Sequence, residues 1–440
     1  MKRSQAHFYL VPILTMLTII NTANLALAGG FALNEQSVKN VGNGYAGTAV
    51  NIDDASAIFF NPAGLTHLTG NSITGSAFVI FPTVRFQNQG STVVTGAPLT
   101  GSNGGEAGVD VVVPNLYAAW SLSDTVKAGI GFNVPFGLAT KYSNDWVGRY
   151  QAVESSLTTI NINPTVAAKL SDNFSVGVGL NVQYAEAILS NAIDFGLIGR
   201  SAGLPTQPQQ ADGFVEVTGS DWSVGYNLGV MYAPSKSTRI GLSYRSAITQ
   251  DIRGNADFTV PQSLQVLTAR GQFTDTGAKA IVNLPDILSL AVYQELSPRV
   301  SVVGDVTWTN WSRFKELRVQ FDNPAQADSV QPENWEDTYR FGLGVNYSVN
   351  DKLTLRTGVT YDPSPIKDEF VTARLPGGDR TLVGVGASYR PSKSFSLDVA
   401  YSHVFSEDSP INQSSTTTGT VRGEFESSVD VVGLQLNWQF

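Results

Sequence analysis

The chain carries few of the side chains that acid–base, nucleophilic or metal chemistry requires. It contains three histidines and no cysteine, and only His67 and His403 lie beyond residue 28. A zinc site built on histidine and thiolate ligands is therefore nearly excluded. Ser402 and Ser406 flank His403, but they form no recognisable triad pattern, and no phosphate loop or dinucleotide fingerprint occurs. We expect no catalytic residue, no metal and no cofactor, and a protein that is not an enzyme.

Another group of residues is suited to forming a rigid contact. Phe59 and Phe60 precede Asn61-Pro62-Ala63, a turn-forming triplet that would break a helix or a central strand. The triplet lies in a glycine-rich stretch close to the N-terminus. Two aromatic rings beside a stiff turn suggest an apolar contact that has to keep its shape.

The elements that would hold this turn follow a targeting segment. Met1-Lys2-Arg3 is positive, residues 8–20 are apolar, and Ala26-Leu27-Ala28 precedes Gly29. This order is typical of a secretory signal peptide. The alternative, a membrane anchor, is disfavoured because the apolar run is short. We expect a signal peptide over residues 1–28.

Composition separates the chain from soluble enzymes. Charged residues make up 15% of it, against roughly 25% in soluble domains. The formal net charge is −9, which argues against nucleic acid as a partner. Glycine, at 42 residues, and aromatic residues, at 10%, are both abundant.

Hydrophobicity alternates with period two in many segments, such as residues 174–184, 222–232, 341–349 and 353–361. One face of each segment is apolar, and the other is mostly Gly, Ser, Asn and Thr with few charges. Segments of about ten residues match a membrane-spanning strand tilted by about 45°. The apolar face is therefore predicted to contact lipid. Aromatic residues near the segment ends would form an interfacial girdle: Tyr232, Trp308, Trp311, Tyr347, Tyr361, Tyr389, Tyr401 and Trp438.

Turn signals then give the strand number. Six short turns occur near residues 123–125, 171–173, 234–238, 297–299, 350–351 and 391–394. They alternate with seven long polar stretches, roughly 86–110, 137–157, 187–220, 247–283, 312–337, 363–380 and 406–428. The pattern predicts an all-β fold, a 14-stranded antiparallel outer-membrane β-barrel with short periplasmic turns.

Both ends of the mature chain fit this barrel. Residues 432–440 alternate and finish on Phe440, which looks like the terminal strand signal of barrels handed to the outer-membrane assembly machinery. Residues 29–70 precede the first strand and are too glycine-rich and aromatic for a flexible tail. We expect them to form a small hatch, or plug, inside the lumen of a barrel over residues 71–440.

At this point the chain resembles a known family. "GGFALNEQS" (residues 29–37) and "GYAGTAVNIDDASAIFFNPAGL" (residues 44–65) resemble the N-terminal hatch of the FadL/TodX family of outer-membrane channels for long-chain fatty acids and hydrocarbons. "FGLATKY" (residues 136–142) is similar to the family's third strand, where a kink opens a gap in the barrel wall. "LSYRS" and "NWSRF" match further strand ends, so the resemblance covers the whole mature chain.

The resemblance implies a passive transport mechanism. Outer loops would capture a hydrophobic ligand and pass it to an apolar pocket in the lumen, and a hatch movement would release it sideways through the gap. Asn61 and Pro62 would contact the kink at Pro135-Phe136-Gly137, and Phe59 and Phe60 would line the path. The alternative is that the Asn-Pro-Ala turn only packs the plug.

One departure concerns the ligand head group. In the family's best-studied type, the resemblance implies basic side chains that meet the ligand carboxylate at positions aligning near Asn191 and Gln331, and neither residue is basic here. Carboxylate recognition is therefore either absent or depends on other residues, for which the candidates are Lys141, Arg149, Arg245, Arg340 and Arg356. For each arginine the alternative is an ion pair across the lumen with a residue such as Asp305 or Asp398.

Three functions stay open. The first is uptake of long-chain fatty acids, and the second is uptake of neutral monoaromatic hydrocarbons by the same route. The third is a structural or adhesive barrel, which would need neither plug nor kink. We expect a monomer in the Gram-negative outer membrane whose partners are a hydrophobic small molecule, membrane lipid and, during biogenesis, the assembly machinery.

Overall fold

The computed structural model describes residues 30–50 and 53–440. The expected signal peptide, residues 1–28, lies outside the described residues. The helices of the described residues are short: α1 (Val38–Gly42), α2 (Ala57–Phe60) and α3 (Phe195–Ser201). The 3-10 turns are η1 (Thr48–Val50), η2 (Pro62–His67), η3 (Gln262–Arg270), η4 (Trp311–Arg313) and η5 (Asp368–Phe370). None of the helices in this part of the chain has the length and apolar character needed to cross a membrane.

The described residues form one sheet of twenty strand segments. These are β1 (Ser72–Asn88), β2 (Val111–Ser121), β3 (Val126–Asn133), β4 (Gly137–Lys141), β5 (Glu154–Ser171), β6 (Phe174–Asp194), β7 (Asp212–Ser235), β8 (Thr238–Arg245), β9 (Ile248–Thr259), β10 (Thr276–Leu284), β11 (Ile287–Ser297), β12 (Val300–Thr309), β13 (Glu316–Phe321), β14 (Ser329–Pro332), β15 (Thr338–Asn350), β16 (Leu353–Asp362), β17 (Arg380–Ser392), β18 (Phe395–Ser406), β19 (Ser409–Ser415) and β20 (Gly419–Gln439).

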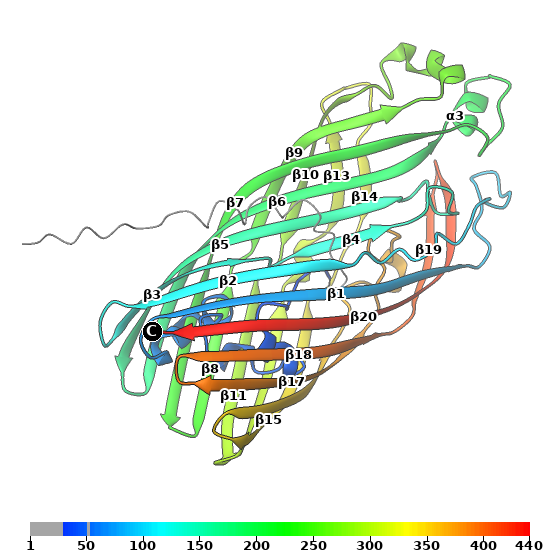
Figure 1. Ribbon diagram of the computed structural model, residues 1–440. Coiled ribbons are helices and arrows are strands. Elements are labelled where there is room, and N and C mark those ends of the chain that lie inside the picture. The colour runs from blue at the N-terminus through cyan, green and yellow to red at the C-terminus, as the bar shows by residue number, and fades with distance from the viewer. Residues whose placement is uncertain (1–29, 51–52) are drawn as a thin grey trace, which may run out of the picture.

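Six of these segments continue the preceding one across a short interruption, namely β4, β9, β11, β13, β15 and β19, so the described chain crosses the wall fourteen times. All ladders between these strands are antiparallel, and β1 pairs with β20 over the whole length of β1. This pairing closes the barrel, with the first and last strands side by side (Figure 1). The predicted 14-stranded antiparallel barrel is confirmed.

The two faces of the wall have the predicted character. On β7 the side chains of Trp222 and Val224 are 59% and 67% exposed, as expected for residues that face lipid. Polar neighbours on the opposite face, such as Asn181, Gln183 and Asn227, are buried in the lumen. One girdle assignment is wrong: Trp311 is 1% exposed and lies inside the barrel.

The predicted short turns are confirmed, whereas most of the predicted long loops are too long. β6 and β7 extend to Asp194 and from Asp212, leaving only residues 195–211 between them. Similarly, β19 and β20 pair up to Ser415 and Gly419. Beyond the membrane a strand has water on its outer face, so its residues become polar on both sides while the ladder hydrogen bonds continue. The polar composition of these strand extensions therefore led to the prediction of loops.

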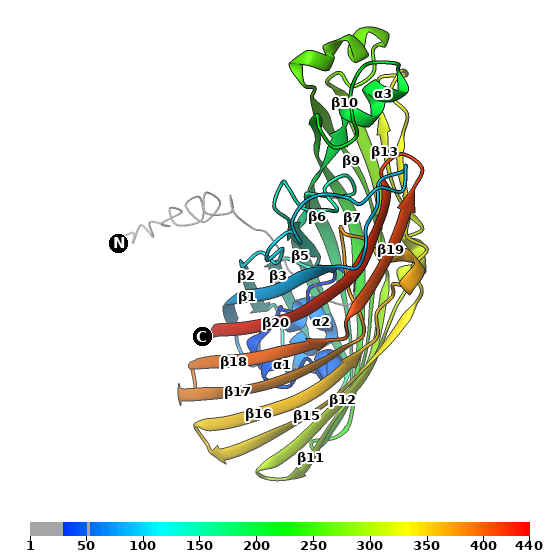
Figure 2. The same ribbon diagram turned by 90° about the vertical axis from the view of Figure 1, so that its right-hand side faces the viewer.

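Residues 30–50 and 53–68 precede β1 and lie within the barrel, where Figure 2 shows α1 and α2 enclosed by the wall. The backbone of this N-terminal segment lies in close contact with the barrel wall. A Cβ atom on Gly358 of β16 would stand 1.9 Å from the carbonyl oxygen of Asn43. Buried Lys39 bonds Asp54 within the same segment at 3.0 Å and approaches Asp398 of β18 at 3.9 Å. This packing fits a compact plug.

Candidate functional site

The barrel wall is interrupted next to β3 and β4. β2 pairs with β1 from Val111 onward, but it pairs with β3 only from Leu116 to Ser121. β4 pairs with β5. Within the described residues, the ladder between β2 and the β3–β4 strand is therefore broken at residues 111–115, between the Leu116–Phe132 pair and the isolated Gly108–Thr140 bridge. We call this interruption the wall window.

The N-terminal segment covers the wall window from inside. Ala32 forms an antiparallel bridge with Phe136, and the Gly137 N–H donates to the carbonyl oxygen of Phe31 at 2.9 Å. Gln36 Nε2 donates to the carbonyl oxygen of Val134 at 2.7 Å, and Asn115 Nδ2 donates to that of Glu35 at 2.9 Å. Backbone groups left free by the broken ladder thus find partners in residues 31–36, which satisfies groups that would otherwise be orphaned in an apolar wall.

The Asn61-Pro62-Ala63 turn lies elsewhere. Asn61 is fully buried and donates from Nδ2 to the carbonyl oxygens of Ala49 at 2.8 Å and Val230 at 3.0 Å. Pro62 packs against Gly177 of β6 and Gly229 of β7. The expected contact of Asn61 and Pro62 with Pro135-Phe136-Gly137 is therefore wrong. The turn is wedged against β6 and β7 because glycines there leave room for it.

Phe59 and Phe60 lie edge to face, with ring centroids 5.1 Å apart. The guanidinium of Arg245 stands 4.1 Å from the centre of the Phe59 ring. Arg245 also donates to Asn181 Oδ1 at 2.6 Å and to the carbonyl oxygen of Phe59 at 2.9 Å. It therefore clamps α2 to the wall.

The other four basic candidates also have partners. Lys141 pairs with Glu154 at 2.7 Å, and Arg149 is buried and pairs with Asp212 at 2.7 Å. Arg340 lies 3.6 Å from Asp305, as the ion-pair alternative expected, and donates to Asn34 Oδ1 at 2.9 Å. Arg356 donates to Ser388 Oγ. Their role in carboxylate binding stays a prediction.

An aromatic cluster lies behind the wall window. The Phe31 ring centroid stands 5.0 Å from Trp311, 5.7 Å from Phe314, 5.6 Å from Trp335 and 6.1 Å from Phe136. Aliphatic side chains extend this cluster across the lumen: Leu157, Ile248, Ile252, Val282, Leu284 and Leu375. Such a surface suits an apolar ligand. Of its members, the sequence pointed only to Phe136 as a site residue.

Sequence reasoning also missed Arg374, in the loop between β16 and β17. Its guanidinium donates to Ser155 Oγ at 3.1 Å and to Asn191 Oδ1 at 3.4 Å. Burial lowers the pKa of Arg374 to about 10, so it stays charged at neutral pH. The two positions that lack a basic residue lie near Arg374. Asn191 accepts its hydrogen bond. Gln331 Nε2 donates at 2.9 Å to buried Glu333, on which the charge of Arg374 acts. Burial raises the pKa of Glu333 to about 8, because a carboxylate is poorly solvated there.

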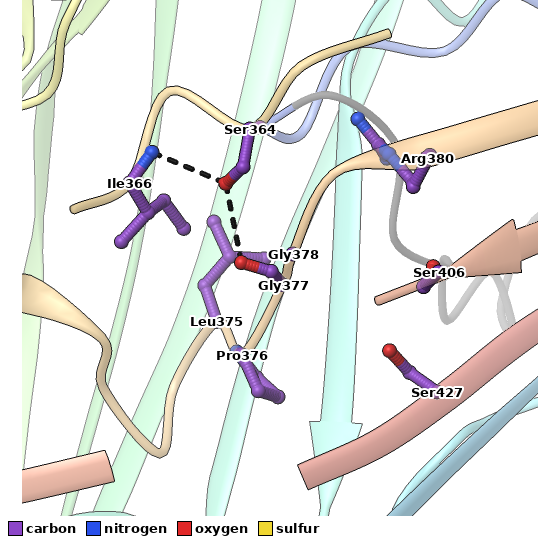
Figure 3. A pocket seen from close by; sticks show the side chains of 10 residues that line it. Ser364, Ile366, Leu375, Pro376, Gly377, Gly378, Arg380, Ser406 and Ser427 are labelled. Atoms are coloured by element: carbon purple, nitrogen blue, oxygen red, sulfur yellow. Dashed lines mark hydrogen bonds between the residues drawn. The ribbon is translucent and has the colours of Figure 1, made fainter. Parts of the chain in front are cut away.

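A small hollow lies beside the same loop. It is lined by Gly30, Ser364, Ile366, Leu375, Pro376, Gly377, Gly378, Arg380, Ser406 and Ser427. Figure 3 shows the Ser364 hydroxyl accepting from the Ile366 N–H and donating to the carbonyl oxygen of Gly377. Arg380 is paired with Asp362 at 3.1 Å. These bonds hold the loop base in shape. Within residues 30–50 and 53–440, no group of three or more His, Asp or Glu side chains is placed to hold a metal ion.

The fold and this site define an outer-membrane β-barrel channel whose lumen holds its own N-terminal segment. A family model described as outer membrane protein transport protein (OMPP1/FadL/TodX) matches residues 19–440. The chain belongs to this family of outer-membrane transport proteins.

Relatives of known sequence match over nearly their whole length. A putative outer membrane protein of Neisseria meningitidis serogroup B is 31% identical, with 94% of this chain and 95% of the relative covered. The long-chain fatty acid transport protein of Escherichia coli K12 is 28% identical with the same coverage.

Solved structures share the fold. A Pseudomonas aeruginosa FadL homologue superposes with a TM-score of 0.87 at 23% identity, covering 93% of this chain and 100% of that one. The Ralstonia pickettii toluene transporter TbuX gives a TM-score of 0.64 at 19% identity, covering 92% and 98%.

Proposed function

We propose that the protein is a passive channel for uptake of long-chain fatty acids across the outer membrane. Outer loops capture the ligand, the aromatic cluster around Phe31 and Trp335 accepts its chain, and the ligand leaves sideways through the wall window. No enzymatic step is involved. The class of hydrophobic-substrate transporter follows from the family, while the ligand and the route are this proposal.

The observation that supports the route is the wall window, which residues 31–36 cover from inside. Releasing an acyl chain into water costs about 0.8 kcal/mol per CH₂ group. A sideways exit into the membrane avoids that cost. The cover is held by a few hydrogen bonds to residues 134–137, each with a net contribution of about 1 kcal/mol, which permits reversible opening.

In this proposal residues 29–70 are the hatch and residues 71–440 the barrel. Asn61-Pro62-Ala63, with Phe59 and Phe60, fixes the hatch against β6 and β7. Pro135-Phe136-Gly137 forms the rim of the exit. When residues 31–36 leave that rim, the cluster behind it opens to the wall window.

The choice of fatty acid rests on the relatives. The E. coli relative, which aligns over 94% of this chain, is named a long-chain fatty acid transport protein. The second candidate is a neutral monoaromatic hydrocarbon. It is favoured by the non-basic residues Asn191 and Gln331, and solved toluene transporters share the fold.

The remaining partners follow from the barrel itself. Its exposed apolar band contacts outer-membrane lipid, and the aromatic C-terminus at Phe440 would be presented to the barrel assembly machinery. The strand ladder of the barrel closes within one chain through β1 and β20. We therefore propose that it works as a monomer.

The test is transport in an E. coli strain that lacks its own long-chain fatty acid transport protein. Expression of this chain should restore uptake of radiolabelled oleate and growth on oleate, with little effect on toluene entry. Restored toluene entry without oleate uptake would favour the hydrocarbon channel. If the barrel is present at the surface but the cells show neither oleate uptake nor toluene entry, both transport functions are contradicted.

A further inference from the structure

The loop between β16 and β17 crosses the outer mouth of the barrel. It starts beside Asp362 and ends at Arg380, yet its middle contacts the opposite wall. Tyr142 Oη donates to the carbonyl oxygen of Ala373 at 2.8 Å, and Thr140 Oγ1 donates to that of Arg374 at 3.1 Å. We call residues 363–379 the crossing loop. It carries Arg374 to β5 and β6, next to the wall window.

Arg374 arrives there without an anionic partner. Its two hydrogen-bond partners, Ser155 and Asn191, are neutral. In the part of the chain that the structure describes, no carboxylate lies within ion-pair distance of it. By contrast, the buried guanidinium groups of Arg149, Arg340 and Arg380 each have an aspartate. Arg245 also has neutral partners, but its guanidinium lies over the Phe59 ring and clamps α2. Arg374 is partly exposed, and a cation that has lost part of its hydration without gaining a counter-charge is destabilised, so this place favours an incoming anion.

Glu333, the acidic residue whose charge acts on Arg374, does not supply that anion. Glu333 accepts hydrogen bonds from Trp335 Nε1 at 3.0 Å and Gln331 Nε2 at 2.9 Å. With its pKa raised to about 8 by burial, Glu333 is mostly neutral at pH 7. The charge of Arg374 is therefore not cancelled at neutral pH.

The surroundings of Arg374 specify the rest of the ligand. Its chain neighbour Leu375 belongs to the aromatic cluster, and so does Leu157, two residues after Ser155. Trp335 joins the same cluster from the side of Glu333. A cation thus stands at the edge of a large apolar surface. A molecule with one anionic end and a long apolar chain would satisfy both parts.

We propose that Arg374, with Ser155 and Asn191, binds the carboxylate of the transported fatty acid and orients its chain along the aromatic cluster. The planar guanidinium can hold a carboxylate by two parallel hydrogen bonds, which a lysine cannot reproduce. Ser155 and Asn191 then position the guanidinium, and the Asn191 amide adds a donor. This inference rests on the proposed function and assigns the head-group site that distinguishes fatty acids from neutral hydrocarbons.

The experiment measures binding of oleate and of methyl oleate to the immobilised full-length mature protein in detergent, with protein-free resin as background. The variants are Arg374→Gln and Arg374→Lys. Arg200→Gln is the matched control, because Arg200 is an exposed outer-loop arginine that also bonds a neutral partner, Gln207. Heat-modifiable gel migration confirms that each barrel is folded.

We expect Arg374→Gln to weaken oleate binding at least tenfold while methyl oleate binding stays within twofold. Arg374→Lys should recover part of the loss, and Arg200→Gln should bind both probes like the wild type. The inference is overturned if Arg374→Gln keeps its oleate affinity, or if it loses both probes equally. If the wild type binds neither probe, the proposed function fails as well, so the two failures are distinguishable.

Discussion

The backbone N–H of Leu33 donates to the carbonyl oxygen of Pro135 at 2.9 Å, and this bond joins the start of the chain to the broken edge of the barrel wall. Together with the Ala32–Phe136 bridge, it attaches the short segment of residues 31–33 to the interrupted wall. Gln36 and Glu35 add hydrogen bonds to Val134 and Asn115, so in the proposed mechanism the wall window opens when residues 31–36 leave it.

Locking residues 31–33 in place should block transport. The chain has no cysteine, so the double variant Ala32→Cys, Phe136→Cys introduces one defined pair. Directly paired antiparallel residues have Cα atoms about 4.5–5.5 Å apart, within the range for a disulfide. We expect oxidised cells to lose most radiolabelled oleate uptake and to recover it after reduction.

The control for the tether is Thr83→Cys, Ser428→Cys, which joins β1 to β20 at a directly paired position away from the wall window. Its uptake should be the same when oxidised and when reduced. Full uptake by the oxidised Ala32–Phe136 tether, with the disulfide verified by mass spectrometry, would exclude movement of residues 31–33 as a transport step.

Removing the N-terminal segment should open the lumen to ions. Deletion of residues 29–70 takes away Lys39 and Asp54, which fill the space beside Asp398. The strand ladders of β1–β20 do not depend on this segment, and a barrel of this size is too wide for wall side chains to fill alone. We expect a nearly silent protein to become conducting in planar bilayers. An unchanged single-channel current from a correctly assembled truncated barrel would contradict the plug.

The lipid-facing half of the fold was accessible from the sequence because the membrane imposes period two on every crossing strand. Val224 and Leu343 had to face outward, and both do. The length of β6 and β7 above the membrane could not be predicted from the sequence. Water surrounds the strands there, so both faces carry polar residues and the period-two pattern is lost. Trp311 illustrates the same limit: an aromatic residue at a strand end can belong to the girdle or to the lumen.

The candidate site was less accessible, because its contacts join segments far apart in the chain. Pro135-Phe136-Gly137 was marked by the resemblance of residues 136–142 to the family's kinked third strand. Phe31 and Arg374 carried no such signal. Phe31 lies near the N-terminus, and Arg374 is one of two basic residues in a polar loop. Only the fold shows that residues 31–33 and the crossing loop meet at one side of the barrel.

Alkaline pH should weaken anion binding next to Arg374. Glu333 has a pKa raised to about 8 by burial, so it is neutral at pH 7 and ionised at pH 9. Its negative charge would then compete with the ligand for Arg374, the charged group that acts on it. We expect dodecanesulfonate, which stays anionic throughout, to bind several-fold more weakly at pH 9. Glu333→Gln should abolish this dependence; a fall of equal size in that variant would assign the effect to another group.

The last prediction concerns the contact between the Asn-Pro-Ala turn and β7. A Cβ atom on Gly229 would stand 2.1 Å from Asn61 Oδ1 and 2.8 Å from Pro62 Cδ, so Gly229→Ala must push the turn away from the wall. The displaced Asn61 would lose its bond to Val230, about 1 kcal/mol or roughly a fivefold shift in the balance between seated and released hatch. Replacing Asn61, Pro62 and Ala63 by Gly-Ser-Gly should act in the same direction, because it removes both the side-chain anchor and the stiffness of proline.

The matched control is Gly304→Ala in β12, where the nearest atom to an added Cβ lies 3.5 Å away. All three variants should assemble, because strand pairing and lipid-facing burial stabilise the barrel and none of these changes touches either. With surface levels matched, oleate uptake should fall or lose its saturation in Gly229→Ala and in the Gly-Ser-Gly variant, and stay normal in Gly304→Ala. Normal uptake rate and saturation in both hatch variants would mean that Asn61-Pro62-Ala63 only fills space, since a gating contact cannot be displaced without changing the equilibrium that it controls.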